Sequence, residues 1–265
     1  MPLMAHTSYA PHLAVATRAA MEAGALLAKH VGRPRRVQTK RSAIDLVTEV
    51  DRASEQLIRA RLERAFPRIG VLGEEGGASG DTATRWIIDP LDGTNNFVHG
   101  FPFFGVSIGL QRNGVMVAGV IYDPLRRELF AALRGGGARL NGRRIRVSPT
   151  RRLSHSLLST GFSSAFLKRR QPYLGWFERF QRSSHGVRRM GSTVLCLASV
   201  ACGRLEGFYE LDLWPWDMAA GWLLVEEAGG RVTGLSGQRA VLERSEMVAS
   251  NGLIHREMLR ALAPR

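Results

Sequence analysis

The sequence predicts an α+β fold in which layers of helices alternate with layers of sheet. Three observations lead to this prediction. Apolar residues recur at helical spacing over most of the first 66 residues, and short apolar runs separated by turn signals follow as far as residue 132. Helical and strand-like segments then alternate from residue 156 onward. We expect one compact unit with two halves, residues 1–150 and residues 151–265.

Two helices are expected before the first sheet. Residues 11–31 place alanines and leucines on one face, and Gly32 follows as a stop signal. A second amphipathic segment begins after Thr48, a residue type suited to capping a helix, and continues to about Phe66.

The remaining elements follow from apolar runs and turn residues. In the first half, the expected strands are residues 71–72, 86–88, 103–110, 115–122 and 128–132, the last three in an antiparallel meander. In the second half, the expected strands are residues 156–159, 207–210, 231–235 and 247–250. The expected helices there are residues 173–182, 193–201, 218–228 and 253–263.

The composition is that of a globular chain. Of 265 residues, 45% are hydrophobic and 23% are charged, which excludes disorder over most of the length. No stretch approaches ~18 uninterrupted apolar residues, and the N-terminus lacks a basic n-region, so neither a membrane span nor a signal peptide is expected. Cys196 and Cys202 are too few for a disulfide framework. We therefore expect buried thiols and a cytoplasmic location.

The chain is strongly basic, with a formal net charge of +14, and 34 of its 37 basic residues are arginine. The arginines are spread along the chain, some of them as adjacent pairs, with no single dense run. A sequence-wide bias that leaves a solvated surface accounts for this pattern. A surface for nucleic acid or an acidic partner is the alternative, because a chain of this charge is drawn to polyanions at low salt.

Acidic residues are concentrated in one part of this basic chain. Ten of the 23 lie between Asp45 and Asp92. Residues 73–76 (Gly-Glu-Glu-Gly) and residues 89–92 (Asp-Pro-Leu-Asp) each follow a strand-like apolar run. We interpret this local reversal of charge as the first indication of a functional site.

Residues 89–92 have the chemistry of a cation site. A proline after a strand-end aspartate forces a bend, so a tight turn can return Asp89 and Asp92 to the same side. The Leu91 carbonyl is then available as well. With Glu74, these groups form an all-oxygen ligand set, which suits Mg2+ and offers nothing to a soft metal.

The next residues, Gly93 and Thr94, begin a short helical turn whose backbone N–H groups would suit a phosphate oxygen. The alternative interpretation of this region is a surface turn with incidental acids, because Asp-Pro and Asp-Gly are common turn dipeptides.

Four segments together resemble the inositol monophosphatase family, particularly its bacterial members. Residues 86–100 (Trp-Ile-Ile-Asp-Pro-Leu-Asp-Gly-Thr-Asn-Asn-Phe-Val-His-Gly) resemble the first signature of the family. Residues 214–221 (Trp-Pro-Trp-Asp-Met-Ala-Ala-Gly) resemble the second. Residues 45–51 and 73–75 are similar to its other acidic elements, in the same order and spacing. The resemblance extends over nearly the whole chain.

The resemblance implies an αβαβα layered sandwich of the sugar phosphatase type and Mg2+-dependent hydrolysis of a phosphate monoester. It also implies two or three Mg2+ ions per active site, sensitivity to lithium and a homodimer. Most metal ligands would lie in the first half, and the second half would carry the remaining ligand and the substrate contacts. The implied ligands are Glu74, Asp89, the Leu91 carbonyl, Asp92 and Asp217.

The resemblance also implies roles around the metals. Thr94, hydrogen-bonded to Asp51, and Glu74 would orient and deprotonate the attacking water. Lys40 and Asp45 would support the site. The implied substrate-binding residues are Asp92, Gly93, Thr94, Gly191, Ser192, Thr193 and Glu210.

Inositol 1-phosphate is the expected substrate, because residues 93–102 and 208–210 look most like the inositol branch. Thr193 and Val194 depart from it, since small alanines usually occupy these positions. Phosphatases of fructose 1,6-bisphosphate, histidinol phosphate or 3′-phosphoadenosine 5′-phosphate remain alternatives. An alternative of another class is a bacterial factor for ribosomal RNA transcription or processing, with a transcription- or ribosome-related partner.

Overall fold

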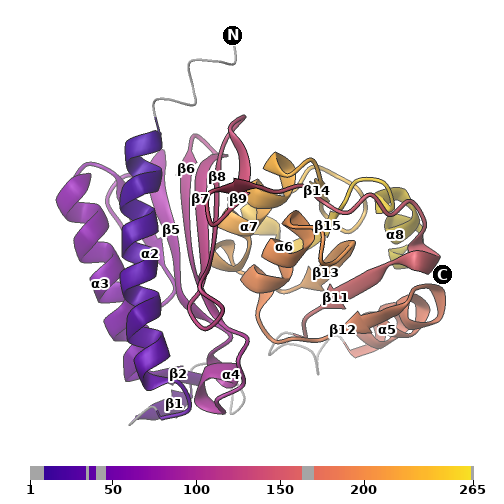
Figure 1. Ribbon diagram of the computed structural model, residues 1–265, viewed down its shortest axis with the longest axis horizontal. Helices are drawn as coiled ribbons and strands as arrows, with labels where there is room; N and C mark the ends of the chain where they lie inside the picture. The colour runs from indigo at the N-terminus through magenta and orange to yellow at the C-terminus, as the bar shows by residue number, and fades with distance from the viewer. Residues whose placement is uncertain (1–8, 34–35, 40–45, 163–169, 264–265) are drawn as a thin grey trace.

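The computed structural model describes residues 9–33, 36–39, 46–162 and 170–263. Its elements stack in five layers (Figure 1). The outer layers are the pair α2 (Ala10–His30) and α3 (Glu49–Ala65) and the pair α5 (Arg170–Ser183) and α8 (His255–Leu262). Two sheets enclose the middle layer, α6 (Thr193–Ala201) and α7 (Pro215–Glu227). This arrangement confirms the predicted αβαβα sandwich.

The helix pair on the outside of the first sheet forms as its sequence predicts. The Thr48 side chain accepts the N–H of Val50 and of Asp51, so it caps α3. The face of α2 that packs inward is built mainly from small residues, which let α3 and the sheet approach closely. Its buried residues are Ala16, Ala19, Ala20, Ala23, Gly24 and Leu27.

The first sheet has eight strands in the order β10-β9-β8-β7-β6-β5-β3-β4. From β5 to β10 it is an antiparallel meander, of which β6 to β8 were predicted, and β3 pairs parallel to β5. The strands are β3 (Gly70–Gly73), β4 (Gly77–Ser79), β5 (Thr84–Asp92), β6 (Gly105–Arg112), β7 (Val115–Asp123), β8 (Glu128–Leu133), β9 (Gly137–Leu140) and β10 (Arg143–Arg144). A separate ribbon joins β1 (Val37–Thr39) to β2 (Leu46–Thr48).

The second sheet has five strands in the order β12-β11-β13-β15-β14. Its strands are β11 (Leu157–Thr160), β12 (Gly186–Arg188), β13 (Gly207–Leu211), β14 (Arg231–Thr233) and β15 (Glu246–Ser250). One apolar cluster lies between α2, α3 and the first sheet, a second surrounds α6 and α7, and a third lies under α5 and α8. Cys196 is buried in the second cluster as expected, whereas Cys202 is only half-buried, and both are free thiols.

Among the element boundaries that differ from the sequence prediction, two matter for the site. β5 continues to Asp92 instead of ending near Ile88, and a bulge between Asp89 and Asp92 replaces the expected turn. α7 begins at Pro215, because proline suits the first position of a helix. The first turn of α7 therefore carries Asp217. None of the described helices is long and apolar enough to cross a membrane.

Candidate active site

The bulge in β5 sets the geometry of the first two carboxylates. Asp89 and Asp92 both pair with β6, but the register shifts between them. Pro90 has no N–H to donate, and the Leu91 N–H donates to Asp89 Oδ1 at 3.1 Å. The Leu91 carbonyl accepts the Thr94 hydroxyl at 3.1 Å instead of a neighbouring strand. Two side chains that would alternate on a regular strand are thereby brought together.

Three carboxylates converge where β5 meets α7. Oxygen atoms of Asp89, Asp92 and Asp217 all lie within 4.8 Å of one another, and this is the one such group of possible metal ligands in the described part of the chain. Asp217 is in the first turn of α7, and its Oδ2 accepts the Trp214 N–H at 2.6 Å. Asp89 is buried, with only 1% of its surface exposed.

The electrostatics of this cluster fit a hard cation. Burial raises the pKa of Asp92 to about 6. Burial, together with the charges of Asp92 and Glu74, raises the pKa of Asp217 well above its ordinary value. Carboxylates this close, one buried and two half-buried, repel one another unless a proton or a cation compensates them. Oxygen donors of this kind suit Mg2+.

The turn after β3, which carries Glu74, is held by the buried carboxylate of Glu55. Glu55 is only 2% exposed. It accepts the N–H groups of Glu75 and Gly76 at 2.7 and 2.8 Å, and it pairs with Arg59 at 2.7 Å. Glu74 lies outside the three-carboxylate group, although its charge acts on that group.

One face of α3 anchors three segments of the site. Asp51, Ser54 and Glu55 are spaced so that they share this face, and all three are buried. Asp51 Oδ1 accepts the Thr94 hydroxyl at 3.0 Å, and the Ser54 hydroxyl donates to the Pro90 carbonyl at 2.9 Å. Glu55 holds the turn that carries Glu74. A single rigid helix thus positions the bulge, the turn and the short helix α4 (Thr94–Val98).

The Thr94 hydroxyl lies between a carboxylate and a carbonyl, 3.0 Å from Asp51 Oδ1 and 3.1 Å from the Leu91 oxygen. The other carboxylate oxygen of Asp51 accepts the Thr48 N–H at 2.8 Å, so the carboxylate cannot rotate freely. A hydroxyl that donates to Asp51 can accept a hydrogen bond from a third group at the same time.

The site has two walls: the segments that α3 holds form one, and residues of the second half form the other. This second wall encloses a cavity of about 100 Å³. The Ser192 hydroxyl donates to Asp92 Oδ2 at 2.5 Å, and the Val194 N–H donates to the same oxygen at 2.8 Å. These bonds join the start of α6 to the carboxylate cluster. The lining residues are Thr160, Gly161, Phe162, Arg189, Gly191, Ser192, Thr193, Cys196, Phe208 and Glu210.

Glu210, on β13, is the buried acid of this cavity. It is 5% exposed, and burial raises its pKa to about 8. The Thr193 hydroxyl donates to its Oε2 at 3.0 Å. Gly161 leaves room for the carboxylate, because a Cβ at that position would lie 2.0 Å from Glu210 Oε1.

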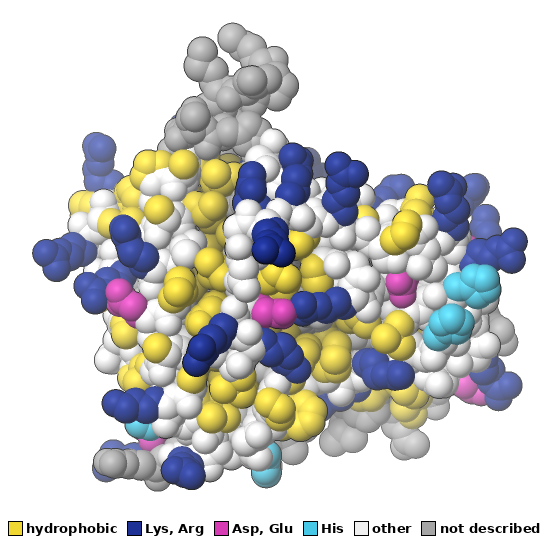
Figure 2. Space-filling view, viewed as in Figure 1, with side chains coloured by type: hydrophobic (Ala, Val, Ile, Leu, Met, Phe, Trp, Pro, Cys, Tyr) yellow, Lys and Arg dark blue, Asp and Glu magenta, His cyan; other side chains and the backbone are white. Residues whose placement is uncertain are grey.

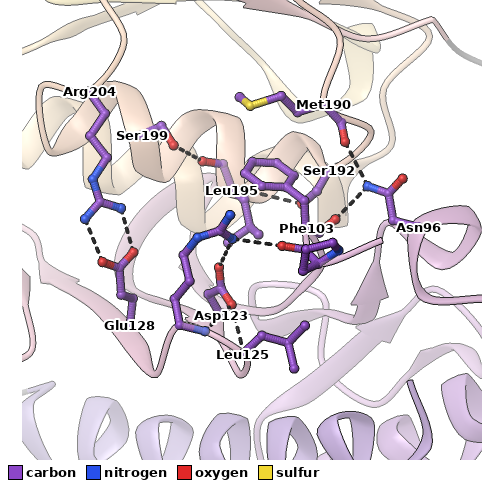
Figure 3. A network of polar contacts seen from close by, with 12 residues as sticks. Asn96, Phe103, Asp123, Leu125, Glu128, Met190, Ser192, Leu195, Ser199 and Arg204 are labelled. Carbon is purple, nitrogen blue, oxygen red and sulfur yellow. Dashed lines mark hydrogen bonds and ion pairs between the residues drawn. The ribbon is translucent and has the colours of Figure 1, made fainter. Parts of the chain in front are cut away.

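Asn96 joins the two walls. Its side-chain amide donates to the Phe103 carbonyl at 2.7 Å and to the Met190 carbonyl at 2.8 Å (Figure 3). Met190 precedes Gly191, whose φ of 84° places it in the left-handed region. A Cβ at Gly191 would lie 2.9 Å from the Asn96 amide nitrogen, so this contact requires glycine.

The structure therefore places the predicted site residues in two groups. The first contains Asp51, Asp89, Leu91, Asp92, Thr94 and Asp217, with Gly93 beside them and Glu74 on the adjoining turn. The second contains Gly191, Ser192, Thr193 and Glu210 around the cavity. Lys40 and Asp45 lie outside the described residues.

Sequence reasoning missed several residues that shape the site. Glu55 and Ser54 share the helix face of Asp51, so their spacing from that residue was an available signal. The spacing of Asn96, Gly161 and Arg189 carried no signal. The contact of Asn96 with Met190 depends on how the two halves meet. Gly161 and Arg189 follow β11 and β12, so their place beside Glu210 depends on strand pairing in the second sheet.

Comparison with known proteins identifies one family over nearly the whole chain. The model of the inositol monophosphatase family matches residues 8–264. The Nus factor SuhB of Pseudomonas aeruginosa is 44% identical over 261 residues, covering 96% of each chain. An inositol-1-monophosphatase of Mesorhizobium japonicum is 43% identical over 253 residues, covering 94% of this chain and 95% of that protein.

Solved structures give the same result. The structure of the extragenic suppressor protein suhB from Bartonella henselae has a TM-score of 0.91 and 42% identity, covering 96% of this chain and 98% of that one. The inositol monophosphatase of Anabaena has a TM-score of 0.86 and 42% identity, covering 95% of both chains. The chain is a member of the inositol monophosphatase family.

Proposed function

We propose that this protein is a Mg2+-dependent phosphatase that hydrolyses inositol 1-phosphate to inositol and phosphate. One observation carries the proposal: the cluster of Asp89, Asp92 and Asp217 adjoins, through Ser192, a cavity that contains the buried Glu210. A cluster that suits metal ions and an acceptor for hydroxyl groups are what a polyol phosphate requires. The name of the Mesorhizobium relative is in keeping with this substrate.

The three clustered aspartates, the Leu91 carbonyl and Glu74 would hold two or three Mg2+ ions. When bound, Mg2+ lowers the pKa of a coordinated water and neutralises charge on the phosphoryl oxygens. The protein contributes the arrangement: the bulge in β5 and the first turn of α7 keep their carboxylates within 4.8 Å before any substrate arrives.

Thr94, Asp51 and Glu74 would act on the attacking water. The Thr94 hydroxyl donates to Asp51 and can accept a hydrogen bond from water, which orients the water for in-line attack. Glu74 would take the proton, and Asp51, which accepts the Thr48 N–H and the Thr94 hydroxyl, would hold Thr94 in place.

The other wall would bind the substrate. Backbone and side-chain donors of residues 191–193, with Gly93, Thr94 and Asp92, would surround the phosphate. Glu210 would accept hydrogen bonds from the hydroxyl groups of inositol, and Thr193 would set its orientation. Lys40 and Asp45 would support the site.

Release of phosphate from a panel of monoesters tests the proposal. Purified protein with Mg2+ is given inositol 1-phosphate, fructose 1,6-bisphosphate, histidinol phosphate and 3′-phosphoadenosine 5′-phosphate. We expect the highest kcat/KM with inositol 1-phosphate and no turnover with EDTA. A preference for another member would assign the protein to that related phosphatase, and turnover with EDTA would contradict the metal assignment.

A second candidate role is suggested by the Pseudomonas relative, which is a Nus factor. We propose a cytoplasmic homodimer that can also serve as a factor in ribosomal RNA transcription or processing. The variant Asp92→Asn separates the two roles. If ribosomal RNA matures normally in cells that carry only this variant, the role does not depend on hydrolysis, and defective maturation would show that it does.

A further inference from the structure

Six arginines lie within 14 consecutive residues, and no Asp or Glu interrupts them. All six are exposed. We call this surface the arginine strip; its members are Arg139, Arg143, Arg144, Arg146, Arg151 and Arg152. In the sequence they look like separate pairs, but the structure places them along one continuous path.

The strip begins on the hairpin of β9 and β10, where β10 is an edge strand of the first sheet. It continues along residues 145–152, which cross from the first half of the molecule to the second (Figure 1). Figure 2 shows dark blue side chains spaced along the upper edge of this face, above that connection, with little magenta among them. The path is thus an extended basic edge.

Carboxylates of the described residues do not neutralise the strip. None of its six arginines takes part in an ion pair within the described residues. Glu227, which lines a hollow with Arg144, instead accepts the N–H groups of Gly135 and Gly137 at 2.6 and 2.8 Å.

The hairpin also places like charges opposite each other. Arg144 on β10 is the direct cross-strand partner of Arg139 on β9, so both side chains lie on the same face of the hairpin. Like charges at such positions destabilise a strand pair. An anionic partner along this face would relieve the repulsion, whereas protection of an edge strand would need only one or two charges.

The composition of the strip indicates which anion it fits. Residues 139–152 contain no Phe, Tyr or Trp, so they lack the aromatic platforms that bind single strands and the aromatic anchors of many protein interfaces. Arginines alone suffice to contact duplex phosphates without reading bases. We propose that the arginine strip binds the phosphate backbone of double-stranded nucleic acid irrespective of sequence.

This inference does not depend on the proposed hydrolysis, because no member of the strip lines the catalytic cavity. The test measures binding of a 20-base-pair duplex of arbitrary sequence over a series of salt concentrations. Six phosphate contacts correspond to a slope of log K against log salt of about −5. The variant R143A/R144A/R146A should reduce the slope to about −3 and weaken binding at low salt.

The matched control is R18A/R64A/R68A, which removes the same charge from exposed arginines on α2, on α3 and beyond the end of α3. We expect its slope to equal that of the wild type. Both variants should release phosphate as the wild type does and melt no lower than it, which shows that they are folded.

Three results would overturn the proposal. Equal losses in the two variants would show that only net charge matters. Tighter binding of a single strand of the same length would indicate another kind of nucleic-acid site. Equal binding of polyglutamate at the same salt would indicate an acidic protein as the partner.

Discussion

The two walls of the active site are built in different ways. On the α3 wall, Asp51, Ser54 and Glu55 are buried on one helix face, and each bonds a segment that carries site residues. On the cavity wall, Thr193 and Glu210 come from separate elements of the second half and meet in about 100 Å³ of open space.

The two walls suit different tasks. Catalysis requires groups fixed within fractions of an ångström, and the α3 wall supplies that rigidity with hydrogen bonds from one helix. A binding cavity can change with single side chains, and on the cavity wall the hydroxyl of a single residue, Thr193, bonds Glu210. We therefore expect variants of the α3 wall and its metal cluster to reduce turnover of every substrate, and variants of the cavity wall to change preference.

The largest effect is expected for Asp92→Asn. This change removes one anionic ligand and nearly preserves shape, so activity should fall by several orders of magnitude and the Mg2+ requirement should rise. Steady-state kinetics against Mg2+ concentration, with a thermal melt for folding, measures both. Glu75→Gln, on the neighbouring turn, is the control and should lose much less; near-normal turnover of Asp92→Asn at low Mg2+ would contradict the metal assignment.

Thr94→Ala should give the next largest loss. It deletes the hydroxyl between Asp51 and the Leu91 carbonyl but leaves the carboxylates in place. We expect kcat to fall about 10²–10⁴-fold, with KM and Mg2+ affinity nearly unchanged. Thr94→Ser should recover part of the rate. A variant that melts lower yet turns over normally would reduce Thr94 to the start of a short helix.

Glu55→Gln tests whether the α3 wall positions the turn that carries Glu74. Glutamine offers one acceptor where the carboxylate bonds two backbone N–H groups and Arg59. Loosening this support should cost about 10–100-fold in Mg2+ affinity or activity, to the same degree for every substrate. Glu63→Gln, an exposed acid on the same helix, should behave as the wild type. An unchanged Mg2+ dependence in Glu55→Gln would show that the turn holds itself.

A smaller effect concerns the stability of the cavity wall. Burial raises the pKa of Glu210 to about 8 from an ordinary 4.5, so the folded protein holds this proton more tightly than the unfolded chain. The stabilisation is complete below pH 4.5 and is lost as the pH rises through about 8. Metal-free wild type should thus lose more unfolding free energy over this range than Glu210→Gln. Parallel curves in urea titrations would contradict it.

The α3 wall and the metal cluster could be predicted from the sequence better than the cavity wall. The acidic motifs are contiguous, and Asp89, Asp92 and Thr94 owe their geometry to a local bulge and a short helix. Such local features leave a pattern. Strands β9, β10 and β12 were not predicted from the sequence. They have at most four residues, too few for a period to appear.

The cavity is harder to read because it depends on contacts between distant segments. Gly161 makes room for Glu210, and Asn96 bonds the Met190 carbonyl 94 positions away. No spacing in the sequence encodes these contacts, since the pairing of β11 with β13 brings about the first and the packing of one half on the other brings about the second.

We expect the α3 wall and its metal cluster to perform hydrolysis and the cavity wall to select the substrate. The most direct test is the ratio of kcat/KM for inositol 1-phosphate to kcat/KM for 4-nitrophenyl phosphate in three proteins: wild type, Thr94→Ala and Glu210→Gln. We expect Thr94→Ala to lower both values and leave the ratio unchanged. Measured above pH 8, where Glu210 is ionised, Glu210→Gln should lower the ratio by about tenfold or more, because charge-assisted hydrogen bonds contribute roughly 1.5–3 kcal/mol. Equal losses on both substrates in Glu210→Gln, or a changed ratio in Thr94→Ala, would contradict the division.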